Sequence, residues 1–86
     1  MQLVFTKPFV KDYRNLPAEI QKRVDKQLGL LLRNPKHSSL RIKKIRGTKD
    51  IWEASVTMKY RLTLQFAKDT CVLRRVGKHD KALDKP

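Results

Sequence analysis

The sequence predicts an α+β fold in which an antiparallel sheet packs against a helical hairpin. Apolar residues recur at helical spacing in the first half of the chain and alternate with polar residues in the second half. The chain has 86 residues, 40% of them hydrophobic. A chain of this size buries only about 60 to 65% of its surface on folding, which limits it to one core. No linker or repeat interrupts it, so residues 1–86 are predicted to form one domain.

The first half is predicted to hold one strand and two helices. Residues 2–6 are rich in β-forming residues, and Thr6 followed by Pro8 is typical of a helix N-terminus. Pro17 interrupts that helix, and a second amphipathic helix follows it and ends at Asn34. The second helix is predicted to be apolar along one face, formed by Ile20, Val24, Leu28, Leu31 and Leu32.

The second half is predicted to form a three-stranded antiparallel meander. The strands cover residues 51–57, 60–66 and 71–77, and short links join them. Before them, residues 37–50 are polar and basic and predict a loop or an irregular edge.

The alternation within these strands predicts which side chains share a face. Trp52 and Tyr60 alternate with core residues, so we expect them to pack in the core rather than stack on nucleic-acid bases. Glu53 and Arg61 are expected on the opposite, polar face. Matching the two polar faces requires an odd-length loop or a bulge at residues 57–59.

The charge balance is strongly basic, with 21 Lys and Arg against 8 Asp and Glu and a net charge of +13. Nucleic acid is therefore the leading ligand class, and an acidic protein or an anionic membrane surface is the alternative. A single cysteine, Cys71, excludes an intramolecular disulfide. One cysteine and two histidines are also too few to supply the four ligands of a structural zinc site. Without a membrane span or a secretory signal, the expected location is the cytoplasm.

The cations gather in the loop at 37–50 and near the last strand. Such a run of cations is expected either to bind nucleic acid or simply to form a solvated face of the protein. Alternation puts the two adjacent arginines of the last strand on opposite faces, so at most one should reach a common site. The predicted RNA-binding residues are Arg41, Lys43, Lys44, Arg46, Arg74, Arg75 and Lys78, joined by Lys49 on the loop.

Several phrases occur in a recognisable order: LPAEIQKRV, NPKHSSLRIKK, IWE, YRL and VGKHD. With the order of the elements, they resemble the RelE/ParE toxin superfamily of type II toxin–antitoxin modules. The resemblance implies a RelE-like β-α-α-β-β-β fold and a cognate antitoxin protein, bound in a toxin–antitoxin hetero-oligomer. Ribonuclease members cut mRNA, mostly in the ribosome, whereas the ParE branch inhibits DNA gyrase.

The resemblance also implies three catalytic residues. Arg61 in KYRL matches an arginine that holds the scissile phosphate, where a guanidinium fork stabilises the developing charge. His79 in VGKHD matches the position of an acid for the leaving oxygen, and Glu53 could accept the 2′-hydroxyl proton. Such a transesterification needs no metal and no organic cofactor. The alternatives are a Glu53–Arg61 salt bridge and a surface histidine beside Asp80.

The chain departs from the ribonuclease pattern in two places. No aromatic residue follows His79, where members often carry a tyrosine, and the first meander strand has Glu53 and Ser55 instead of paired lysines. His37 resembles a histidine that some members use, although it also suits a turn beside Pro35. A ParE-like gyrase inhibitor and a non-catalytic RNA- or ribosome-binding module therefore stay as alternatives to an mRNA endoribonuclease.

Overall fold

The first strand turns directly into the first helix at Thr6. A computed structural model of residues 1–86 places β1 at Gln2–Phe5 and α1 at Lys7–Arg14. The Thr6 hydroxyl accepts a hydrogen bond from the Phe9 N–H at 3.3 Å and donates one to the Leu73 carbonyl at 2.9 Å. Thr6 therefore caps α1 and ties it to the last strand, as the N-cap pattern predicts.

Helix α2 (Ala18–Arg33) follows Pro17 and lies against the sheet. Its buried side chains are those of Val24, Gln27 and Leu31, at helical spacing. The prediction that Leu32 belongs to the core face is wrong, because its side chain is 47% exposed. Leu32 is about 100° around the helix from Leu31, which moves it to the rim of the buried face.

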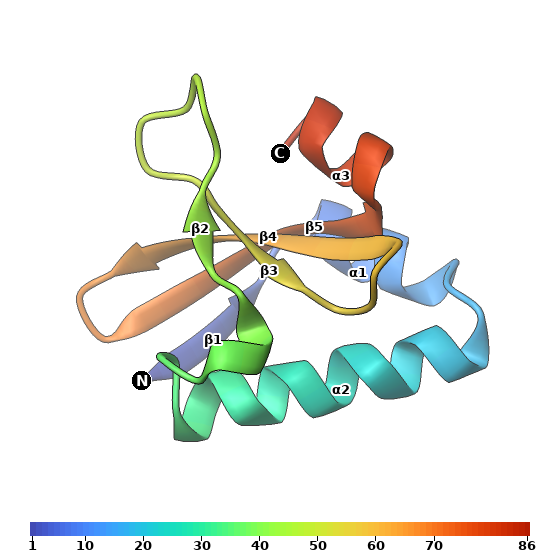
Figure 1. Cartoon of the computed structure of the whole chain (residues 1–86), viewed down its shortest axis with the longest axis horizontal. Coiled ribbons are helices and arrows are strands. Elements are labelled where there is room, and N and C mark those ends of the chain that lie inside the picture. Colours follow the sequence, from blue (N-terminus) through green and yellow to red (C-terminus); the bar gives the residue numbers. More distant parts are fainter.

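The sheet has five strands in the order β1-β5-β4-β3-β2 (Figure 1). The strands β3 (Trp52–Ser55), β4 (Tyr60–Ala67) and β5 (Thr70–Lys78) form the predicted antiparallel meander. β2 is a two-residue edge strand, Lys43–Lys44, beside β3. The α+β fold is confirmed, but the sheet is not wholly antiparallel. β1 pairs with β5 in parallel, a pairing that needs the long crossover through both helices.

The register of β3 on β4 confirms the predicted sharing of faces. Ser55 lies opposite Arg61 and Glu53 lies opposite Thr63, so these four side chains share one face. The five residues between Ser55 and Arg61 are the odd-length connection that the parity of the two strands requires.

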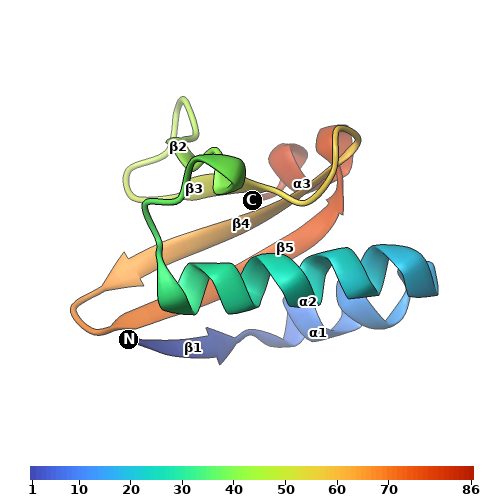
Figure 2. The same ribbon diagram turned by 60° about the horizontal axis from the view of Figure 1, so that its bottom comes forward.

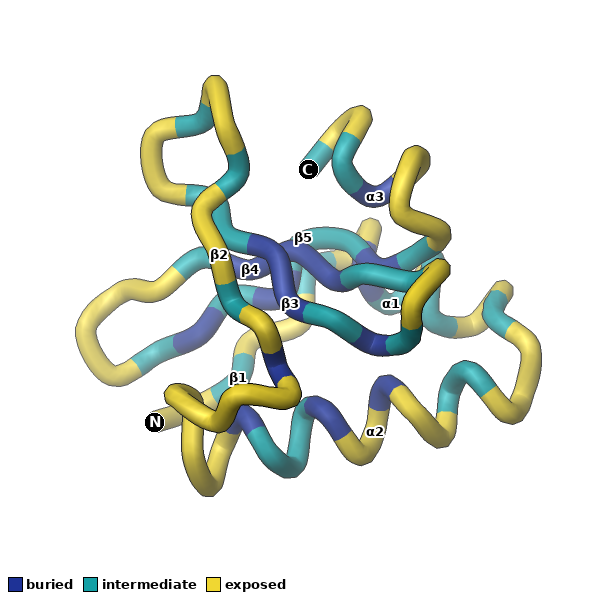
Figure 3. Tube along the Cα trace, viewed as in Figure 1, coloured by how far each residue is buried: buried dark blue, intermediate teal, exposed yellow.

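A short C-terminal helix, α3 (His79–Asp84), packs on the face of the sheet opposite α2 (Figures 1 and 2). The sequence pattern did not indicate this helix. Ala82 of α3 is buried, and so are Glu53 and Thr63 of the strands, at 5% and 0% exposure. Figure 3 shows buried positions in α3, β3 and β4. The face predicted to be open and polar is therefore partly covered.

The core lies between the sheet and the first two helices, with its most buried side chains on β4, β5 and α2. Trp52 and Tyr60 pack against it, as predicted, and both stay half-buried. Leu40, in the 3₁₀ turn η1 (Ser38–Leu40), is 1% exposed and joins the core from the segment predicted to be a loop. None of the helices is long and apolar enough to cross a membrane.

Cys71 lies in β5 with no exposed surface, and burial raises the pKa of its thiol from 9.0 to about 11. We expect thiol reagents to label it slowly at pH 8 in the folded protein and rapidly in urea, because the thiolate is the reactive form. Folding favours the protonated thiol, so its contribution to stability is complete below about pH 9 and is lost as the pH rises through 11. Denaturant titrations at pH 8 and 11 test this, with Cys71→Ala as the control that lacks this component of the decline.

Candidate functional site

Arg61 and Glu53 form an ion pair on the α3 side of the sheet. The Arg61 Nε and Glu53 Oε1 atoms are 3.7 Å apart, and the two side chains are 19% and 7% exposed. Glu53 is buried and Arg61 is partly open to solvent. The guanidinium of Arg61 therefore lies at the surface, and the carboxylate of Glu53 lies beneath it. This is the cross-strand salt bridge that the sequence offered as the alternative to a catalytic Glu53. The catalytic roles of both residues stay predictions.

The guanidinium of Arg61 is also held by the turn between β3 and β4. Its Nη1 atom donates to the carbonyl oxygens of Thr57, of Met58 at 3.3 Å and of Tyr60 at 3.0 Å. The positive group is thus fixed at the end of the hairpin by main-chain oxygens. These hydrogen bonds use Nη1 and the ion pair with Glu53 uses Nε, so Nη2 is the atom through which an added anion could bind without displacing them.

His79 is brought to the same end of the sheet by the main chain. Its N–H donates to the Lys59 carbonyl at 2.8 Å, within the turn that holds Arg61. The imidazole is 49% exposed, and its Nδ1 is 3.5 Å from Asp80 Oδ1. The fold therefore brings the backbone of His79 to the Arg61 turn, while the side chain of His79 pairs with its neighbour.

The predicted RNA-binding cations fall into two groups. Arg41, Lys43, Lys44 and Arg46 are exposed along the β2 edge, and Lys78 is exposed at the end of β5. Lys43 lies opposite Glu53 and Lys44 lies opposite Trp52, so the two lysines project from different faces of the sheet.

The expectation that Arg74 and Arg75 lie on opposite faces is wrong, because Arg74 is the extra residue of a β-bulge: Arg75 lies opposite Thr63 and Leu73 lies opposite Leu64. The Pro86 carbonyl that Arg74 contacts also accepts from the Thr63 hydroxyl at 3.3 Å, so both arginines lie beside Thr63 but bind different partners. Arg74 donates from Nε to the Pro86 carbonyl at 3.0 Å and from Nη1 to Gln65 at 3.2 Å. Arg75 forms a two-point ion pair with Asp12 of α1, at 2.7 and 3.1 Å. That pair raises the pKa of Arg75 and holds α1 to β5. RNA binding by either arginine stays a prediction.

His37 has a local role in the fold. Its Nδ1 accepts a hydrogen bond from the Ser39 N–H at 3.1 Å and lies 3.0 Å from the Ser39 hydroxyl, so it caps η1. Both contacts lie within its own turn, and a catalytic role for His37 stays a prediction.

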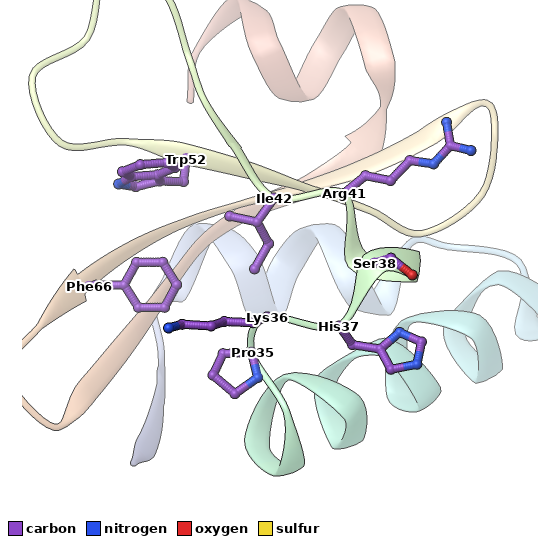
Figure 4. A pocket seen from close by; sticks show the side chains of 8 residues that line it. All are labelled: Pro35, Lys36, His37, Ser38, Arg41, Ile42, Trp52 and Phe66. Atoms are coloured by element: carbon purple, nitrogen blue, oxygen red, sulfur yellow. The ribbon is translucent and has the colours of Figure 1, made fainter.

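Sequence reasoning missed a surface hollow of about 590 Å³ at the other end of β4. Trp52, Phe66 and Ile42 line it together with Pro35 and Lys36 (Figure 4). Its residues come from the end of α2 and from three strands or their flanks, and no spacing in the sequence links them. The only sequence feature that indicated this region was the alternation of Trp52 with core residues. That alternation predicted core packing and not a hollow.

A family model described as the ParE toxin of the type II toxin–antitoxin system parDE matches residues 3–83. The chain therefore belongs to the RelE/ParE superfamily of type II toxin–antitoxin toxins, as its motifs indicate. Toxin RelE3 of Methanocaldococcus jannaschii is 33% identical over 82 residues, with 88% of each chain covered.

Solved structures agree with this assignment. The RelB–RelE antitoxin–toxin complex from Methanococcus jannaschii contains a chain with a TM-score of 0.74 and 26% identity, covering 96% of this chain and 98% of that one. The intact E. coli RelBE toxin–antitoxin complex contains another, with a TM-score of 0.69 and 25% identity over 88% of this chain and 93% of that one. YafQ from E. coli, at 15% identity and a TM-score of 0.78, shares the fold over 92% of this chain and 93% of that one.

Proposed function

We propose that this toxin is an endoribonuclease that cleaves mRNA, bound in the ribosome, and thereby inhibits translation. The observation that carries the proposal is the Arg61–Glu53 pair at the end of β4, with the His79 backbone bound to the same turn. Its RelE relatives support the ribonuclease branch of the superfamily. Such an activity acts in the cytoplasm, where mRNA and ribosomes are found.

In the proposed reaction the 2′-hydroxyl of RNA attacks the adjacent phosphorus. Arg61 binds the phosphate oxygens and stabilises the charge that develops on them. Glu53 accepts the hydroxyl proton, and His79 donates a proton to the leaving 5′-oxygen. The phosphorus–5′-oxygen bond breaks and a 2′,3′-cyclic phosphate forms. These steps use side chains of this protein and RNA alone.

We further propose that a cognate antitoxin binds and silences the toxin in a hetero-oligomer. Two of the similar solved structures are toxin–antitoxin complexes. A net charge of +13 favours an antitoxin with an acidic segment, because complementary charge accelerates and orients association.

Toeprinting of mRNA on purified ribosomes tests the activity. New 3′ ends within the A-site codon support the proposal, and a 2′-deoxy substitution at the cleaved nucleotide should abolish them. DNA supercoiling by gyrase, measured in parallel, tests the ParE-like alternative that the family description keeps open. Intact mRNA with blocked supercoiling would replace the ribonuclease proposal, and intact mRNA with normal supercoiling would leave a binding module.

Binding of RNA should weaken steeply with salt. If about six of the exposed cations neutralise phosphates, the logarithm of affinity should fall with the logarithm of salt concentration with a slope of roughly −4 to −5. Anisotropy titrations of a labelled single-stranded RNA measure this slope. The double substitution Lys43→Ala and Lys44→Ala should make it shallower by about 1.4, because two single-strand contacts are lost. An unchanged slope would exclude the β2 edge from the interface.

A further inference from the structure

The hollow beside Trp52 has the form of a ligand site. Its volume, about 590 Å³, is within the range of roughly 300 to 1,000 Å³ that ligand pockets usually have. Trp52 and Phe66 meet edge to face, with ring centroids 6.4 Å apart and planes at 67°, and form two walls. Ile42 projects between them and Pro35, whereas Arg41 and His37 point away from the space (Figure 4).

Lys36 supplies a positive charge at this apolar surface. Its side chain extends toward Phe66 across the mouth of the hollow (Figure 4). Phe66 is 40% exposed, so its ring offers a face that no other side chain covers completely. An aromatic face beside a cation is the combination that binds an unpaired base and its phosphate.

We propose that this hollow is a base-binding subsite for single-stranded RNA, in which Phe66 and Trp52 contact one base and Lys36 neutralises a neighbouring phosphate. The inference rests on the proposed function, because it takes RNA as the substrate. It adds a second contact point far from the reacting phosphate. Phe66 follows Arg61 by five residues on β4, about 17 Å along the strand, and projects from the opposite face.

The two aromatic rings favour RNA over an acidic protein segment as the occupant, because a base has a π-face that stacks on them. The β2 edge supplies the positive charge along the route of the strand. Lys43 projects on the side of Glu53 and Lys44 on the side of Trp52, so cations continue from the catalytic face around the edge to the hollow. Residues 35–49 contain no Asp or Glu, and their cations are Lys36, Arg41, Lys43, Lys44, Arg46 and Lys49. A polyanionic strand following this route meets no like charge from the segment.

Trp52 is the sole tryptophan of the chain and therefore reports on the hollow directly. We expect a short single-stranded 2′-O-methyl RNA, which cannot undergo the cleavage, to quench Trp52 fluorescence in a saturable way. Phe66→Ala should weaken the binding of this RNA roughly ten-fold, in line with the usual contribution of one stacked base. Lys36→Ala should weaken it as well, whereas Lys22→Ala, an exposed lysine of α2 that does not line the hollow, should not.

Circular dichroism should show each variant folded before binding is compared. RNA binding that leaves Trp52 fluorescence unchanged, or that is equally tight for Phe66→Ala, would overturn the inference. Quenching by an acidic peptide but not by the RNA would also overturn it and make the hollow a protein-docking site. If wild-type protein cuts no mRNA on ribosomes yet shows the quenching and its loss in Phe66→Ala, the nuclease proposal fails while the base subsite stands. If the protein cleaves mRNA but the RNA does not quench Trp52, the base subsite fails while the nuclease proposal stands.

Discussion

Replacing Arg61 by alanine should reduce mRNA cleavage by roughly 10² to 10³-fold, the usual cost of removing a group that stabilises transition-state charge. Arg61 is fixed by the turn carbonyls and by Glu53, so the guanidinium is held in place before RNA binds. Arg61→Lys should recover only part of the rate, because an ammonium keeps the charge but lacks the separate nitrogens that contact Glu53, the turn carbonyls and a phosphate at once. Single-turnover cleavage on ribosomes, followed by toeprinting, measures the effect.

The control must separate chemistry from folding. Arg61→Ala leaves the 7%-exposed Glu53 side chain without its cation, which by itself destabilises the fold. The double variant Glu53→Gln, Arg61→Ala removes both charges and should restore stability, but it also lacks the proposed base and therefore serves as a control for folding only. Cleavage is compared for Arg61→Ala itself at a temperature where circular dichroism shows it folded, and a wild-type rate there would make the proposed mechanism wrong.

The local elements of the fold could be predicted because they depend on neighbours in the sequence. Thr6 and Pro17 mark the start of the first two helices, and the parity of Glu53 and Arg61 predicts their common face, which allows their ion pair. These features need no knowledge of distant contacts. The RelE/ParE resemblance followed from the same kind of information, the order of short phrases along the chain.

The features that the sequence did not indicate all depend on contacts between distant segments. β1 pairs with β5 across some 70 residues, and α3 forms against β4 and β5 although its own sequence, HDKALD, has little amphipathic pattern. The bulge at Arg74, which breaks the regular alternation of Arg74 and Arg75, is likewise set by the pairing of two strands. For the candidate site this means that the Arg61–Glu53 pair was predictable, whereas the hollow around Phe66 was not.

Leu31 and Leu32 are adjacent leucines of one helix, yet their replacement by alanine should have very different effects. Leu31 is 1% exposed and packs in the core between α2 and the sheet, whereas Leu32 is 47% exposed. Leu31→Ala removes buried methyl groups and leaves a cavity, which costs about 2 to 5 kcal/mol of unfolding free energy. A domain of this size has little stability to spare, so Leu31→Ala should lower Tm by about 8 °C or more, at about 4 to 8 °C per kcal/mol.

Leu32→Ala is the matched control, because the same atoms are deleted one position further along the same helix. Its side chain already contacts water, so the loss should stay below about 1 kcal/mol. Urea unfolding followed by circular dichroism compares the two variants directly. Equal destabilisation by the two substitutions would mean that both leucines are buried, so that α2 is rotated relative to the structure. Such a rotation would also break the hydrogen bond from Gln27 to the Ser55 carbonyl, which is 2.7 Å long in the structure. A difference of at least 1 kcal/mol, with Leu32→Ala the more stable variant, agrees with the packing of α2 against the sheet that carries the Glu53–Arg61 pair.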